Sequence, residues 1–173
     1  VLELAMNHPG EIRTLSLICQ PDVAVITNVA PVHLEFFRSL DHIAAAKAEI
    51  LEGMRDGGTL LFNGEDERLC SMARRFDGPS MDFGTAGDHR FNVGAEMWPA
   101  LQGMKIAIQT PTSRFQTWVP LSGKQYLYNI AAAVAVAVTL GLSDVQIGQG
   151  VDGLGALDRR GQIRSLSPAR GVN

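Results

Sequence analysis

The feature that most constrains the fold of this chain is the alternation of short apolar runs with helical stretches in its first third. The hydrophobic pattern predicts strands at residues 1–6, 23–29 and 59–63 and helices at residues 11–19 and 40–54. Such alternation is typical of a mostly parallel sheet with crossover helices. Residues 22–28 are apolar almost throughout, as expected of a central strand that is covered on both faces. We therefore expect an α/β fold.

The second half of the chain indicates a different local arrangement. Residues 66–76 have a helical pattern, and shorter apolar runs follow, separated by turns that contain glycine and proline, at 81–83, 91–98, 104–109 and 115–119. These runs predict a small antiparallel β excursion. Residues 125–142 are again helical, and Ser143 is a natural N-cap for a further helix. With 173 residues, the chain has the length of one domain.

Composition and charge argue against several classes of protein. The chain is 46% hydrophobic and 19% charged, which is typical of a packed domain rather than of a disordered one. A net charge of -3 with scattered basic residues predicts no nucleic-acid partner. Cys19 and Cys70 form no CxxC pair, so neither a disulfide framework nor a zinc site is indicated, and a reducing cytoplasm fits. The longest apolar run, residues 130–142, is shorter than the roughly 20 residues of a transmembrane helix, so no such segment is expected.

Glu3 and His33 are the first candidates for chemistry, because each lies near the end of a predicted strand. The carboxyl ends of parallel strands share one edge of the sheet, where ligands bind, so we expect the two side chains to converge. A carboxylate and an imidazole suit Mg²⁺, which usually takes about one or two ligands from the protein. On spacing alone, a solvated carboxylate and a turn histidine after Pro31 are the simpler interpretation.

Lys47, Asn129 and the arginines at 159 and 160 each leave two interpretations open. Lys47 lies in an alanine-rich helix, where it is either an ordinary solvated residue or a lysine held close against neighbouring segments. Asn129 either caps a long helix or offers its amide to an adenine edge. Arg159 and Arg160 either solvate a loop or hold a phosphate.

The turn at residues 7–12 opens a helix, so its backbone amides could receive an anion. A plain strand-to-helix turn, built from common turn residues, is the simpler interpretation. His42 and His89 lie among polar residues, and we expect both at the surface without a functional role.

Several motifs in order resemble the central domain of the Mur ligases. They lie at residues 1–12 (VLELAMNHPGEI), 27–37 (TNVAPVHLEFF), 46–51 (AKAEIL), 123–133 (GKQYLYNIAAA) and 158–163 (DRRGQI). The resemblance covers nearly the whole chain and is closest to the D-alanyl-D-alanine-adding branch of the family. An ordered series of motifs is more specific than any single one.

The resemblance implies a metal site. It assigns Glu3 and His33 to magnesium, and it assigns to Lys47 a carbamate, formed with carbon dioxide, that helps to hold Mg²⁺ in a site of two ions. A carbamate turns a cationic side chain into an anionic oxygen ligand, which a hard metal accepts.

The resemblance also implies an ATP site. It places Asn129 at the adenine, Arg160 at the ATP phosphates and Asn28 beside the reacting phosphates. Gln125 and Tyr126 stand where many members have His-Asn, so adenine recognition is expected to differ in detail.

The implied reaction is a ligation in peptidoglycan precursor synthesis. ATP phosphorylates the terminal carboxylate of a UDP-muramoyl tripeptide, and the amine of D-alanyl-D-alanine displaces phosphate from the acyl phosphate. The resemblance implies a monomeric enzyme of the bacterial cytoplasm. Two alternatives remain: a related ligase with another acceptor, such as a folylpolyglutamate or cyanophycin synthetase, or a non-catalytic nucleotide-binding domain.

Parts of the family pattern are missing from the sequence. No GxxxxGK[ST] phosphate loop occurs, although the family carries one upstream of the first-strand glutamate. We expect residues 1–173 to form a partial central domain, without the N-terminal substrate domain, the phosphate-loop strand and the C-terminal domain, and to be inactive alone.

Overall fold

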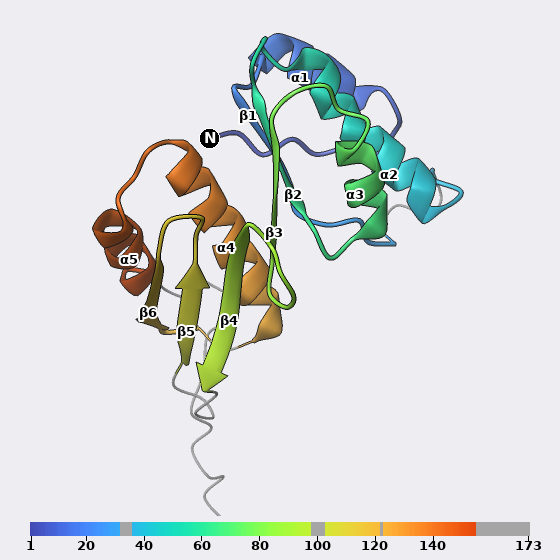
Figure 1. Ribbon diagram of the computed structural model, residues 1–173. Helices are drawn as coiled ribbons and strands as arrows, with labels where there is room; N and C mark the ends of the chain where they lie inside the picture. The colour runs from blue at the N-terminus through green and yellow to red at the C-terminus, as the bar shows by residue number, and fades with distance from the viewer. Residues whose placement is uncertain (32–35, 98–102, 122, 155–173) are drawn as a thin grey trace, which may run out of the picture.

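The computed structural model describes residues 1–31, 36–97, 103–121 and 123–154, which form one six-stranded sheet flanked by helices (Figure 1). The strands are β1 (Val23–Ile26), β2 (Thr59–Asn63), β3 (Ser80–Gly84), β4 (Phe91–Met97), β5 (Met104–Gln109) and β6 (Arg114–Val119), and they lie in this order across the sheet. The helices are α1 (Glu11–Cys19), α2 (Leu40–Ala48), the 3-10 helix η1 (Glu49–Gly53), α3 (Glu67–Ala73), α4 (Lys124–Thr139) and α5 (Asp144–Asp152).

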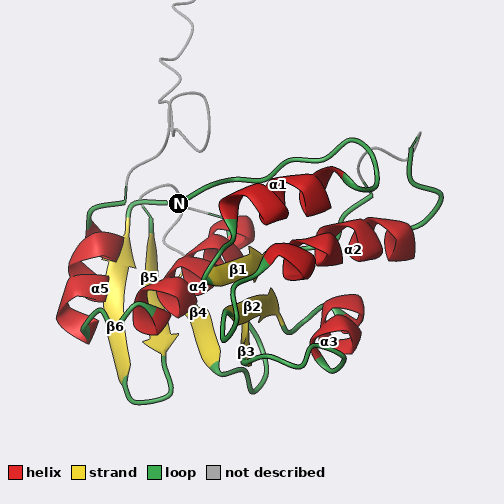
Figure 2. Cartoon of the chain, turned by 90° about the horizontal axis from the view of Figure 1, so that it is seen from above, coloured by secondary structure: helices red, strands yellow, loops and turns green. Residues whose placement is uncertain are grey.

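Strands β1, β2 and β3 are parallel. Helices cover both faces of β1 and β2, whereas Met81 and Phe83 of β3 pack on the side of α4. Successive side chains of a strand point to opposite faces, and in β2 both Leu60 and Leu61 are fully buried. Leu61 belongs to the core beneath α4, whereas Leu60 packs with residues of α3 and η1. Figure 2 shows α4 and the helices α1 to α3 on opposite sides of these strands. The predicted parallel sheet with crossover helices is therefore confirmed.

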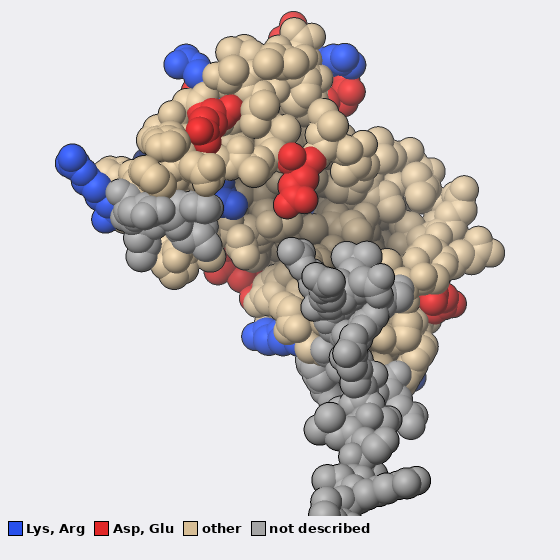
Figure 3. Space-filling model, turned by 180° about the vertical axis from the view of Figure 1, so that it is seen from behind, with Lys and Arg blue, Asp and Glu red and all other residues tan. Residues whose placement is uncertain are grey.

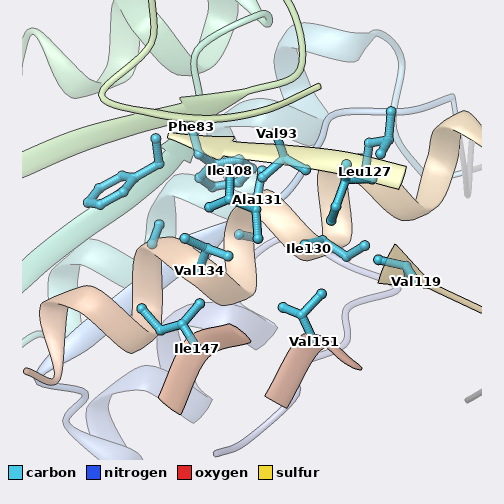
Figure 4. Packing of buried hydrophobic residues seen from close by; sticks show 14 of the residues in the cluster. Phe83, Val93, Ile108, Val119, Leu127, Ile130, Ala131, Val134, Ile147 and Val151 are labelled. Carbon is cyan, nitrogen blue, oxygen red and sulfur yellow. The ribbon is translucent and has the colours of Figure 1, made fainter. Parts of the chain in front are cut away.

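The main hydrophobic core lies between the sheet and the last two helices (Figure 4). Helix α4 contributes residues spaced three or four apart, which form one face of the helix. Small side chains let this helix approach the strands closely. Members of the core include Phe83, Val93, Ile108 and Val119 from the strands, Leu127, Ile130, Ala131 and Val134 from α4, and Ile147 and Val151 from α5.

The antiparallel part of the sheet consists of β4, β5 and β6. Strand β4 begins parallel to the end of β3, through the pairs Phe83↔Phe91 and Gly84↔Asn92, and then runs antiparallel to β5. The predicted excursion is thus confirmed for the last three strands. It is wrong for β3, because α3 is a crossover that returns the chain to the same edge, so that β3 continues the parallel sheet.

The strand predicted at residues 1–6 is not formed. Val1 and Leu2 are exposed, and within the described residues β1 pairs with β2 alone. An extended segment without a neighbouring strand makes no ladder hydrogen bonds and leaves its backbone groups to water. The apolar pattern indicated burial, but burial in a sheet also requires a pairing partner.

Other predicted elements are present with shifted ends. Strand β1 ends at Ile26 instead of residue 29, and the helix predicted at 40–54 is α2 followed by η1. Helix α1 packs closely against η1: a Cβ added to Gly53, the last residue of η1, would lie 2.2 Å from the carbonyl carbon of Ser16. Ser143 caps α5 as predicted, in a capping box with Gln146.

The distribution of surface charge and the lengths of the helices both bear on the sequence predictions. On the face shown in Figure 3, the basic and acidic side chains of the described residues are scattered and form no continuous basic patch. None of the helices in the described ranges has the length and apolar character needed to cross a bilayer.

Candidate functional site

Polar residues gather at the carboxyl ends of β1, β2 and β3. Asn28 follows β1, Glu65 follows β2 and Thr85 follows β3. Helix α4 reaches the same edge, because the Tyr128 hydroxyl donates a hydrogen bond of 2.7 Å to the Glu65 carboxylate. Asn129 is the next residue of this helix. In open parallel sheets, ligands bind at this edge.

The segments that carry Glu3, Asn28 and Lys47 are held together by a small apolar cluster. It comprises Met6, Val29, Phe37, Leu40, Ile43 and Ala46. The first segment therefore lies beside the end of β1, while the predicted convergence of Glu3 with His33 involves a residue outside the described ranges. Glu3 itself is exposed and lies in an extended segment instead of a strand.

Lys47 lies half-buried on α2, and this burial lowers the pKa of its amine. Within the described ranges, no carboxylate lies within ion-pair distance of it. Only the uncharged amine attacks carbon dioxide, so a lowered pKa favours carbamate formation. The surroundings of Lys47 therefore fit the modification that the family resemblance implies.

The turn before α1 is closed by carboxylates of the chain itself. Glu11 accepts hydrogen bonds from the backbone N–H groups of Asn7 and His8. Glu49, which reaches across from η1, accepts the backbone N–H of Gly10 at 2.8 and 2.9 Å. These carboxylates occupy the donors that an external anion would use, so the turn is structural. Glu49 also ties this turn to the helical segment that follows Lys47.

Glu65 has the most strongly shifted pKa that is resolved in the described part of the chain. Burial acts to raise the pKa of this carboxyl group, but hydrogen bonds from Thr85, Tyr128 and Ala86 outweigh burial and lower the pKa to about 2. Sequence reasoning missed Glu65. The available signal was its position just beyond a buried strand.

The interpretation of His89 as a surface residue is wrong. Its side chain is 13% exposed, and Nδ1 lies 2.7 Å from Asp82 Oδ2. The ring lies against Gly64 and Gly84, where added Cβ atoms would approach it to 2.6 and 2.2 Å. His89 therefore fixes the loop after β3 against the end of β2. His42, in contrast, is exposed as expected.

Asn129 does not cap a helix. Helix α4 begins at Lys124 with Gly123 as its N-cap, and Asn129 lies in the second turn with its side chain exposed. The capping interpretation is therefore wrong, and the amide is accessible to a ligand.

The implied metal ligands are only partly within the described residues. Among these residues, no group of three His, Cys, Asp or Glu side chains is arranged to hold a metal ion. His33 and Arg160 lie outside the described ranges. Glu3 and a carbamate on Lys47 would supply two oxygen ligands, the kind and about the number that Mg²⁺ takes from proteins.

The fold and the position of the polar residues define an α/β domain with a candidate ligand site at the carboxyl edge of a parallel sheet. The model of the Mur ligase middle domain matches residues 1–137. The chain therefore belongs to the Mur ligase family, which its motifs had indicated.

Individual relatives are UDP-N-acetylmuramoyl-tripeptide--D-alanyl-D-alanine ligases. The UDP-N-acetylmuramoyl-tripeptide--D-alanyl-D-alanine ligase of Haemophilus influenzae is 29% identical over 166 residues, which are 95% of this chain and 34% of the relative. A crystal structure of MurF from Acinetobacter baumannii matches with a TM-score of 0.88 and 28% identity, over 97% of this chain and 37% of that chain. MurF ligase from Thermotoga maritima in complex with ADP matches with a TM-score of 0.80 and 28% identity, over 91% of this chain and 36% of that chain.

The chain spans about a third of the length of these relatives. Their fold is shared over nearly all of the present chain, so its order of strands and helices is that of the middle domain.

Proposed function

We propose that this chain is the ATP-binding middle domain of a ligase that joins D-alanyl-D-alanine to UDP-N-acetylmuramoyl tripeptide in peptidoglycan precursor synthesis. The observation that carries the proposal is that segments bearing Asn28, Lys47 and Asn129 pack around the carboxyl ends of the parallel strands. The likeness to UDP-N-acetylmuramoyl-tripeptide--D-alanyl-D-alanine ligases over most of the chain supports the same substrates. The family resemblance implies a monomeric enzyme of the bacterial cytoplasm.

The residues of this chain divide into a nucleotide group and a metal group. In the nucleotide group, Asn129 offers an exposed amide to the adenine, Asn28 lies beside the phosphates and Arg160 binds them. In the metal group, Glu3, His33 and the carbamate of Lys47 would hold Mg²⁺. Bound magnesium offsets the charge of the crowded phosphates.

The chemistry that these residues serve is activation of a carboxylate. The terminal carboxylate of the tripeptide takes the γ-phosphoryl group of ATP and releases ADP, and the amine of D-alanyl-D-alanine then replaces phosphate to form the amide. The protein contributes by positioning the reactants and by stabilising developing charge. The phosphate loop and the binding of the amino component belong to other segments of a full-length ligase.

Phosphate release by a full-length ligase carrying this chain tests the proposal. We expect release that requires both UDP-muramoyl tripeptide and D-alanyl-D-alanine. Lys47→Ala removes the site of the carbamate and is expected to slow release about 100-fold or more. Arg114→Ala, at an exposed position on the antiparallel strand β6, serves as the matched control and is expected to leave release within about twofold.

Two results would contradict the proposed function. Release that requires glutamate-type acceptors instead of D-alanyl-D-alanine would indicate a folylpolyglutamate or cyanophycin type of ligase. Nucleotide binding without release under any acceptor would indicate a non-catalytic domain.

A further inference from the structure

The backbone around Glu65 is held rigidly at the end of β2. The side chain of Asn63 accepts the backbone N–H of Glu65 at 2.9 Å. The N–H of Gly64 continues the pairing with β3 through the carbonyl of Phe83, also at 2.9 Å. Gly64 further lies against the ring of His89, so a larger residue there would have to displace that ring. The position from which the Glu65 side chain extends is therefore well defined.

The carboxylate of Glu65 joins three separate parts of the chain. Oε1 accepts hydrogen bonds from the N–H and the hydroxyl of Thr85, at 2.5 and 3.0 Å, and from the N–H of Ala86 at 2.9 Å. Oε2 accepts the hydroxyl of Tyr128, which is 63 positions further along the chain. One side chain thus connects the loop after β2, the loop after β3 and helix α4. Hydrogen bonds to a charged acceptor are stronger than those between neutral groups.

Helix α4 depends on external contacts at its start. Its N-cap is Gly123, with φ 136°, and this residue makes no side-chain cap hydrogen bond to the first turn. Lys124 and Gln125 in that turn are exposed. Packing of Leu127 and Ile130 against the sheet is apolar and therefore non-directional, whereas a hydrogen bond has a preferred geometry. The bond from Tyr128 to Glu65 therefore fixes where the first turns of α4 lie relative to the strand ends.

We propose that Glu65 and Tyr128 form a clamp that positions Asn129 for the adenine and thereby sets the affinity of the site for ATP. Both are positioning residues, because they act through the backbone of α4 and through Asn129 without a role in the chemistry. This inference rests on the proposed function. Asn129 follows Tyr128 directly in the helix, so a change in the depth or tilt of this turn moves the amide with it.

Steady-state kinetics of the full-length ligase carrying this chain test the clamp. Tyr128→Phe removes only the hydroxyl, and we expect it to raise KM for ATP about fivefold with kcat within about twofold. Glu65→Ala is expected to raise KM for ATP by at least as much. The double variant is expected to resemble Glu65→Ala, since both changes break the same hydrogen bond. Glu67→Ala, an exposed carboxylate nearby, is the matched control and should leave KM for ATP unchanged.

The outcomes separate the clamp from the proposed function. If the unchanged ligase is active but Tyr128→Phe lowers only its melting temperature, with KM for ATP unaltered, the bond is merely structural and the clamp is refuted. Fully additive effects of the two changes would also refute it. If the unchanged ligase neither binds ADP nor releases phosphate, the proposed function fails, and the clamp fails with it. If the ligase binds ADP without releasing phosphate, the dissociation constant for ADP takes the place of KM, and the same fivefold weakening is expected.

Discussion

The parallel and antiparallel halves of the sheet differ in how they are covered and in where their connections lie. Strands β1 and β2 of the parallel half have helices on both faces, whereas β4, β5 and β6 pack against α4 and α5 on one face. On the other face of the antiparallel half, Gln109 and Trp118 are exposed. Buried residues therefore alternate with more exposed ones in β5, whereas β2 is buried along nearly its whole length.

This difference explains why the candidate residues cluster in one half. Parallel strands all end at the same edge, so the loops after β1, β2 and β3 meet there. Antiparallel strands end at alternate edges, so their loops are divided between two ends of the sheet. Helix α4 lies across both halves, which lets the antiparallel half support a helix whose first turns belong to the site. The hydrophobic core thus spans both halves, while the candidate site residues are concentrated in one.

Neighbouring alanine substitutions should show the largest difference between the halves. The side chains of Leu60 and Leu61 point to opposite faces of the sheet, and both are fully buried. Leu60→Ala and Leu61→Ala are each expected to lower the free energy of unfolding by about 2–5 kcal/mol. In β5, Ile108→Ala should cost a similar amount, whereas Gln109→Ala should cost less than about 0.5 kcal/mol. Urea unfolding of each variant measures these values. An equal loss of unfolding free energy at Ile108 and Gln109, or a negligible loss at Leu60, would contradict the proposed difference between the two halves.

A smaller effect is expected from the titration of Glu65. Its pKa of about 2 lies below the ordinary value of 4.5, so the charged carboxylate stabilises the fold above pH 4.5, and this contribution is lost as the pH falls through about 2. We expect the advantage of the unchanged chain over Glu65→Gln in urea unfolding to be full near about pH 6 and to shrink as the pH falls from 4.5 to about 2. Glu65 is exposed, so the advantage should stay below about 1 kcal/mol. An advantage that grows on acidification would show that the hydrogen bonds to Glu65 do not favour its charged form.

Local sequence patterns predicted those elements whose formation depends mainly on their own residues. Strand β2 follows the turn at Gly57 and Gly58, and its apolar run predicted both of its ends. The segment at residues 1–6 has an equally apolar pattern but pairs with none of the described strands, and the pattern within a segment does not reveal whether it will be paired. The parallel direction of β3 was also missed, because it is set by the crossover through α3.

The candidate site was predictable only in part for a similar reason. Asn28, Lys47 and Asn129 were assigned through motifs that resemble a family, and the structure brings their segments to one region. The bond between Glu65 and Tyr128 joins residues far apart in sequence. Glu65 lies in none of the family motifs, and Tyr128 lies in the motif at residues 123–133 without a role assigned to it. Contacts of this kind follow from the packing of α4 on the sheet, which local periodicity does not describe.

The most direct test of the whole interpretation is hydrogen exchange, followed by mass spectrometry, of the full-length ligase with and without ADP and Mg²⁺. We expect nucleotide to slow exchange at the carboxyl edge and at the start of α4, in residues 27–31, 64–67, 84–87 and 124–130. Exchange in β5 and β6, residues 104–119, should not change. Protection confined to β5 and β6, with none in the loops after the parallel strands, would contradict the placement of the ATP site.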